Sequence, residues 1–141
     1  MTYFSKNNRP SGDHPQGGKL KILFVASEAR PFMKVGGLGE IMYSLPKALR
    51  DLGHDARIMI PKYASMDIDR IVFGSEISGL KIVTSNIEQA GLFVCNVLRY
   101  DNENGKTEAY FLENQEYYEK RANTYGYADD AVRLALLSKG S

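Results

Sequence analysis

Residues 20–53 decide the fold, and they read LKILFVASEARPFMKVGGLGEIMYSLPKALRDLG. The stretch opens on a short apolar run, Leu20–Ala26, whose length and Ile, Phe and Val content predict a strand buried on both faces. After a loop at 27–37, apolar residues recur every three or four positions, which predicts an amphipathic helix. Gly53 follows the last of them, where a left-handed C-cap is favoured. Pro46 inside this pattern predicts a kink or a break.

A second apolar run, Arg57–Ile60, is stopped by Pro61 and predicts another buried strand. A strand, a helix and a strand in this order form a βαβ unit, whose two strands are parallel and whose crossover is right-handed. Short strand-like runs then follow, separated by turn residues, at Ile71–Phe73, Leu80–Thr84, Leu92–Tyr100 and Glu108–Leu112. Together they predict an α/β fold, a parallel sheet with an antiparallel β extension beside it.

Two further patterns refine this prediction. Residues Asp101–Gly105 have the composition of a hairpin loop. From Asp129 onward the chain reads as a helix, since Asp129 and Asp130 suit a helix N-terminus. The residues that follow, 132–137, are apolar almost all round, which predicts a helix enclosed by other elements.

Composition narrows the classes of partner. Eighteen basic and 17 acidic residues leave a net charge of +1, so neither a nucleic acid nor a membrane surface is expected as partner. The one cysteine, Cys95, lies in an apolar run and is expected to be a buried, inert thiol. Residues 1–18 carry no apolar signal-peptide core, and we expect them to form a disordered leader. A cytoplasmic location fits these features; a plastid stays open for a plant protein, although no clear transit peptide is present.

The loop between the first strand and the helix carries the chemistry, in the run Lys34-Val35-Gly36-Gly37-Leu38-Gly39. Free amides at a helix start attract anions, glycines allow close approach, and Lys34 adds a mobile positive charge. The alternative is that Gly36 and Gly37 only make a tight turn beside a solvated lysine. The run is neither a P-loop nor a dinucleotide fingerprint, because it lacks both spacings.

The stretch Ala26–Glu40 resembles the N-terminal signature of bacterial glycogen synthases and plant starch synthases. Later motifs match in order, with a looser fit at 66–89: Leu45–Leu49, Leu52–Asp55, Ile60–Tyr63, Tyr110–Asn114 and Tyr125–Arg133. The resemblance implies that a GT-B glycosyltransferase consists of two facing Rossmann-like halves and that residues 19–141 are part of the first half. It also implies helices on both faces of the sheet. It also implies transfer of glucose from ADP-glucose to the non-reducing end of an α-1,4-glucan, with retention of configuration and without a metal or other cofactor.

The resemblance further implies roles for individual residues. Lys34 matches the family's lysine that touches the donor phosphates, with the Gly36 and Gly37 amides beside it. Asp129 matches an aspartate on the sugar side of the cleft, or is simply a helix-start acid. Glu28 matches the family's Ser-Glu pair, and would either bind a sugar hydroxyl or brace the loop.

The chain also departs from the family pattern. Glu40 stands where aspartate is usual, Asp130 where asparagine is common, and Leu134 where phenylalanine is common. The family's later histidine motif and its donor-binding half with the catalytic glutamate are not among these 141 residues, so no catalytic residue is assigned. We therefore expect no synthase activity from these residues alone. The alternatives are a stand-alone module that binds glucan or nucleotide, and a GT-B enzyme with another sugar-nucleotide donor.

Overall fold

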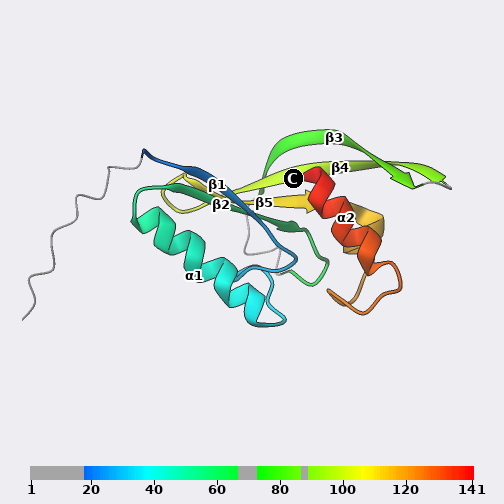
Figure 1. Ribbon diagram of the computed structural model, residues 1–141, viewed down its shortest axis with the longest axis horizontal. Coiled ribbons are helices and arrows are strands. Elements are labelled where there is room, and N and C mark those ends of the chain that lie inside the picture. The colour runs from blue at the N-terminus through cyan, green and yellow to red at the C-terminus, as the bar shows by residue number, and fades with distance from the viewer. Residues whose placement is uncertain (1–17, 67–72, 87–88) are drawn as a thin grey trace, which may run out of the picture.

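The structure, a computed structural model, describes residues 18–66, 73–86 and 89–141. A five-stranded mixed sheet forms its centre, with α1 and α2 on opposite faces (Figure 1). The sheet order is β1-β2-β5-β4-β3. The elements are β1 (Lys21–Val25), α1 (Gly37–Asp51), β2 (Asp55–Pro61), β3 (Phe73–Asn86), β4 (Gln89–Asp101), β5 (Thr107–Glu113), the π-helical turn η2 (Gln115–Glu119) and α2 (Asp130–Gly140).

The parallel half of the sheet confirms the predicted strand–helix–strand unit. Strand β1 pairs with β2 in parallel, with Ile22 opposite Ala56, and β2 pairs in parallel with β5, with Ile58 opposite Ala109. The carboxyl ends of these three strands therefore lie together at one end of the sheet. The glycine loop leaves β1 at that end.

Strand β1 does not bury both faces, so that prediction is wrong for the described residues. Leu23 is 44% exposed and Val25 41%, whereas the alternating residues Ile22 and Phe24 are half-buried. The reason is the placement of the helices: α2 packs against β3 and β5, so no described helix covers this face of β1 at the far edge of the sheet. Its apolar residues therefore alternate between a covered and an uncovered face.

The antiparallel half confirms the predicted extension. Strand β4 pairs antiparallel with both β5 and β3, so β5 has a parallel neighbour on one side and an antiparallel one on the other. The predicted hairpin loop is present: Gly105 has φ +68°, and the Asn102 side chain accepts the Lys106 N–H. The runs at Phe73 and Leu80–Thr84 are one strand, β3, with an irregular register between them. Residues 71 and 72 of the predicted run lie outside the described residues.

Helix α1 begins and ends as predicted, but it is not broken. Gly53 has φ +94°, and the His54 N–H reaches back to the Leu49 carbonyl at 3.0 Å, which is a left-handed C-cap. The helix continues through Pro46, whose ring is fully buried. Burial of that ring offsets the hydrogen bond that proline removes.

The apolar pattern of α1 consists of two stripes, of which one faces the sheet. Met42 packs against the core and Pro46 is buried, whereas four large apolar side chains on the adjacent stripe are exposed: Leu38, Ile41, Leu45 and Leu52. The sequence pattern alone does not separate the two stripes, because their apolar residues together form one broad face of the helix.

Helix α2 confirms the predicted helix but not its enclosure. Leu136 and Leu137 are buried, whereas Leu134 is 41% exposed. One face packs on the sheet so closely that a Cβ on Gly140 would lie within 3.0 Å of Ile82 and Leu112. The opposite face has no described neighbour that covers it. No helix in the described ranges has the length and apolar character needed to cross a bilayer.

The buried core lies between these layers. Cys95 is 1% exposed, and burial raises the pKa of its thiol despite a contact from the Asn114 amide at 3.7 Å. This confirms the expected buried, inert cysteine. Phe111 and Leu112 are fully buried on opposite faces of β5. Strand β5 therefore joins the two halves of the core.

Candidate functional site at the carboxyl end of β1

In the β1–α1 loop, residues 29–33, which precede the glycines, pack against the core. Ala29 is fully buried, and the Met33 N–H donates to the Ala29 carbonyl at 2.9 Å. The Arg30–Pro31 peptide bond is cis. Phe32 packs edge-to-face on Phe111 with ring centroids 5.0 Å apart. These contacts leave residues 34–36 at the rim of the sheet.

Glu28 holds the glycine loop from inside. Its side chain is buried, and its carboxylate accepts the backbone N–H groups of Val35 and Gly36, the latter at 3.0 Å. A buried carboxylate that receives two amide hydrogen bonds has its charge satisfied locally. The geometry therefore favours the bracing role for Glu28 over a contact with sugar.

Lys34 lies in a charged cluster on the outer side of the loop. Its Nζ is 2.5 Å from Glu40 Oε1, and Arg30 Nη1 lies 3.0 Å from Glu40 Oε2. The hydrogen bonds from Lys34 and then from Arg30 lower the pKa of Glu40. Two cations and one carboxylate leave an excess of one positive charge at the rim. Glu40, one of the three residues that depart from the family pattern, is thus the partner of Lys34.

Gly39 allows Lys34 to lie close to the helix. A Cβ on Gly39 would come within 3.1 Å of Lys34 Cγ and 3.3 Å of Lys34 Cβ. The side chain of Lys34 therefore occupies the space that any larger residue at 39 would need.

The start of α1 remains open towards an anion. Gly36 is the N-cap residue, with extended backbone (φ −134°), and provides no side-chain cap. Its own N–H is taken by Glu28, but a Cβ at Gly37 would meet nothing within 4 Å. The amides of the first turn and the helix dipole can therefore act on a ligand that approaches Gly37.

Asp129 lies apart from this cluster. Its carboxylate pairs with Arg121 Nη2 at 2.6 Å. The neighbouring Asp130 holds the turn before α2 instead, since it accepts the N–H groups of Gly126 at 2.7 Å and Tyr127 at 3.2 Å. The structure thus brings Glu28, Lys34, Gly36 and Gly37 together, with Asp129 on a different loop.

That second loop nevertheless touches the first. The Tyr125 hydroxyl is 2.6 Å from Ser27 Oγ, and Thr124 Oγ1 lies 3.5 Å from the sulfur of Met33. Between the loops is an open cavity of about 380 Å³, lined by Met33, Val35, Ser65 and residues 122–125. Lys34 does not line this cavity, because its amine is directed to Glu40.

Sequence reasoning missed the tyrosines and arginines that fix these loops. Tyr63 is buried and donates from its hydroxyl to the Ser27 carbonyl at 2.8 Å. Arg133 is 3% exposed, and its Nη1 bonds the Thr124 carbonyl at 3.0 Å and Asp130 Oδ1 at 2.6 Å. The signals for them were a charged residue within an otherwise apolar helix, for Arg133, and the places of Tyr63 and Arg133 within motifs that match the family. Among the described residues, no cluster of His, Cys, Asp and Glu could hold a metal ion.

Comparison with known proteins gives a consistent answer. The family model for the starch synthase catalytic domain matches residues 21–141. A glycogen synthase of Clostridium acetobutylicum is 41% identical over 121 residues, and one of Caldicellulosiruptor bescii is 42% identical over 120. The catalytic domain of starch synthase IV from Arabidopsis thaliana, solved bound to ADP and acarbose, matches with a TM-score of 0.70 and 29% identity.

The extent of these matches is uneven. They cover 85% or 86% of this chain, but 24% of each of those three proteins. The chain therefore spans about a quarter of the length of the relatives it matches. The family model covers every residue from the first of β1 to the last of the chain. This chain belongs to the family of starch synthase catalytic domains.

Proposed function

We propose that this chain is part of a retaining glucosyltransferase that transfers glucose from ADP-glucose to the non-reducing end of an α-1,4-glucan. Residues 19–141 would form part of its N-terminal, acceptor-side half. The family match and the two glycogen synthase relatives support this activity. The observation that carries the proposal is Lys34, a cation at the rim of the sheet beside the uncapped start of α1.

The residues of the loop would act on the leaving group. When the glycosidic bond to the donor breaks, negative charge grows on the departing diphosphate, and fixed positive charge stabilises it. Lys34 would provide that charge by moving its ammonium from Glu40 towards a phosphate. Arg30 keeps Glu40 paired when Lys34 leaves, because both of its carboxylate oxygens lie 3.0 Å from Arg30 Nη1.

The other predicted site residues would support this step in different ways. Gly37 presents an open helix start, and Gly36 keeps the loop surface free of a side chain. Glu28 sets the shape of the loop through the two amides it holds. The placement of Asp129 on the sugar side of the cleft stays a prediction. Its carboxylate pairs with Arg121. We place the protein in the cytoplasm, in line with its single, buried cysteine.

A chimera tests the proposal. Residues 21–141 of this chain would replace the matching segment of the Clostridium acetobutylicum glycogen synthase, and transfer from ADP-glucose would be measured. The chimera with Lys34→Ala is expected to lose about 10²-fold in kcat/KM, the usual loss for one preorganised donor to a developing charge. Lys47→Ala, an exposed lysine on α1 paired only with Asp51, is the matched control.

The outcomes separate the parts of the proposal. Equal turnover in the Lys34 and Lys47 variants would refute the role of the loop. An unmodified chimera that is folded but inactive with ADP-glucose would refute the assignment of residues 21–141 to the N-terminal half of such an enzyme, because the Clostridium acetobutylicum part supplies the donor-binding half. The 141-residue chain by itself is expected to show no glucan extension, since the family's catalytic glutamate is not among these residues.

A further inference from the structure

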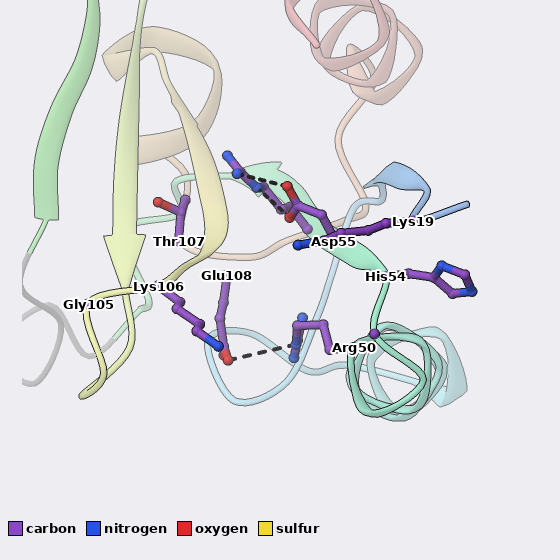
Figure 2. A pocket seen from close by; sticks show the side chains of 10 residues that line it. Lys19, Arg50, His54, Asp55, Gly105, Lys106, Thr107 and Glu108 are labelled. Carbon is purple, nitrogen blue, oxygen red and sulfur yellow. Dashed lines mark hydrogen bonds and ion pairs between the residues drawn. The ribbon is translucent and has the colours of Figure 1, made fainter. Parts of the chain in front are cut away.

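A larger cavity lies at the opposite end of the sheet from the glycine loop. Its volume is about 500 Å³. Because β1, β2 and β5 are parallel, their amino ends meet here, and the end of α1 and the β4–β5 loop complete the wall (Figure 2). The charged residues that line it are Lys19, Arg50, Asp55, Arg57, Lys106 and Glu108. This cavity has no part in the function proposed above.

The two carboxylates of the cavity are already bound by arginines. Asp55 receives a bidentate contact from Arg57, with Nε–Oδ1 2.9 Å and Nη2–Oδ2 3.0 Å. Glu108 lies 3.7 Å from Arg50 Nε and also accepts from the Asn102 amide at 2.8 Å. Four cations against two carboxylates leave an excess of two positive charges in the cavity.

The two lysines carry this excess. Among the described residues, neither Lys19 nor Lys106 is within ion-pair distance of a carboxylate. Figure 2 shows the Lys19 side chain running towards Asp55 and the Lys106 side chain towards Glu108, while the ring of His54 points away from both. The field is positive here: the hydrogen bond from Arg57, helped by nearby Lys19, lowers the pKa of Asp55 against the effect of burial.

We propose that this cavity binds a small molecule through a phosphate group. Two ammonium groups without a described carboxylate partner face one space, which suits a doubly charged, multi-oxygen anion. The two guanidinium groups are already bonded, Arg57 to Asp55 and Tyr110 and Arg50 to the Ala56 carbonyl, and add positive charge beside that space. A volume of about 500 Å³ is in the usual range for small-molecule sites. A nucleic acid fits less well, because the chain as a whole has a net charge of only +1.

Calorimetric titration of the 141-residue chain with pyrophosphate at low salt tests the proposal. Saturable binding to one site is expected, with a Kd of about 1 mM or tighter. The double variant Lys19→Ala/Lys106→Ala is expected to bind about tenfold more weakly, since it loses the two unpaired charges. Neither lysine forms an ion pair with another described residue, so folding should be preserved, which circular dichroism would check.

Two controls isolate the cavity. Lys47→Ala/Lys120→Ala removes the same net charge from exposed i,i+4 pairs elsewhere, and should leave binding unchanged. Lys34→Ala reports on the glycine loop, for which a diphosphate ligand is proposed above, so any binding that only this variant loses belongs to that loop and not to the cavity. Inorganic phosphate and glycerol phosphate would be compared last: a preference for the ester assigns the site to a phosphorylated metabolite, and equal binding assigns it to the free ion.

Three results would overturn the proposal. One is the absence of saturable binding by any of these phosphates. Another is an equal loss of affinity in the cavity double variant and in its charge-matched control, which would indicate general attraction. The third is loss of binding in Lys34→Ala with full binding in Lys19→Ala/Lys106→Ala, which would place the phosphate on the glycine loop.

Discussion

Glu28 is the residue on which the shape of the candidate site depends most directly. Its buried carboxylate is the acceptor for two loop amides, and hydrogen bonds to a charged group contribute about 1.5–3 kcal/mol. Glu28→Ala leaves both amides without this acceptor. We expect it to lower the free energy of unfolding by about 2–3 kcal/mol, measured by urea denaturation.

The matched control is the other glutamate of the same loop. The Glu40 side chain is 43% exposed and paired with Lys34 and Arg30, and surface pairs of this kind contribute little to stability. Glu40→Ala should therefore change stability much less than Glu28→Ala. Equal costs for the two substitutions would contradict the bracing role of Glu28.

Gly39 controls the position of Lys34 by its lack of a side chain. In the chimera described above, Gly39→Ala should displace the lysine, because the new Cβ would be 3.1 Å from Lys34 Cγ. A misplaced contact group of this kind costs about 10-fold or more in kcat/KM. Ser44→Ala, one turn further along α1, is the control, and equal activity in the two variants would show that Lys34 tolerates the extra methyl group.

At the scale of the element, α1 offers a test of which stripe faces the sheet. Met42→Ala should lower the free energy of unfolding by about 1–2 kcal/mol, less than a fully buried methionine would, because Met42 is only partly buried. Ile41→Ala, next to it on the exposed stripe, should stay within about 0.5 kcal/mol of the parent chain. A larger loss at Ile41 than at Met42, by thermal or urea unfolding, would reverse the assigned orientation.

How far sequence could predict the elements depended on whether the deciding contact was local. Gly53 as a C-cap and Asp101–Gly105 as a hairpin loop were predictable, because each follows from the conformational freedom or side-chain bonding of residues in the turn itself. The exposure of Leu23 was not, because it depends on where β1 lies in the sheet. The continuity of α1 through Pro46 depends likewise on burial of its ring by other elements.

The candidate site shows the same division between local and distant contacts. The sequence motif was enough to predict that Lys34, Gly36 and Gly37 lie together with Glu28 on one loop. The Ser27–Tyr125 contact joins residues 98 positions apart, and no periodicity encodes it. The role of Arg133 was not predicted either, because Arg133 donates to backbone carbonyls of a loop that only the fold brings near.

For the whole molecule, the shifted carboxyl pKa values predict how stability varies with pH. Bonds from the Gly126 N–H first, and then from Arg133, outweigh burial and lower the pKa of Asp130 below 3.8. Burial raises the pKa of Glu113, but bonds from Asn96 and Lys62 outweigh it, and the net shift is below 4.5. Groups with a lowered folded pKa bind protons more readily when unfolded. The stability that these two carboxylates contribute is therefore fully present when the pH is above their ordinary pKa values. It is lost as the pH falls through their lowered pKa values in the folded chain.

Urea denaturation between neutral pH and pH 2 would check this prediction. Asp130→Asn keeps an oxygen acceptor for the turn but cannot titrate, so the variant should lose less stability on acidification than the parent chain. Asp51→Asn, at an exposed helix pair, serves as the control. An acid profile unchanged by Asp130→Asn would show that this carboxylate is not a source of the pH dependence.

Because a buried carboxylate already engages its inner amides, the glycine loop has two layers with different tolerance to redesign. The inner layer consists of Glu28 and the amides of Val35 and Gly36, and a change there alters the shape of the loop that carries Lys34. In the outer layer, Arg30 and Lys34 both pair with Glu40 on the solvent side, and each of these side chains can be substituted separately. Substitutions that alter the charge of this rim should therefore be made at the outer layer, with Glu28 left unchanged.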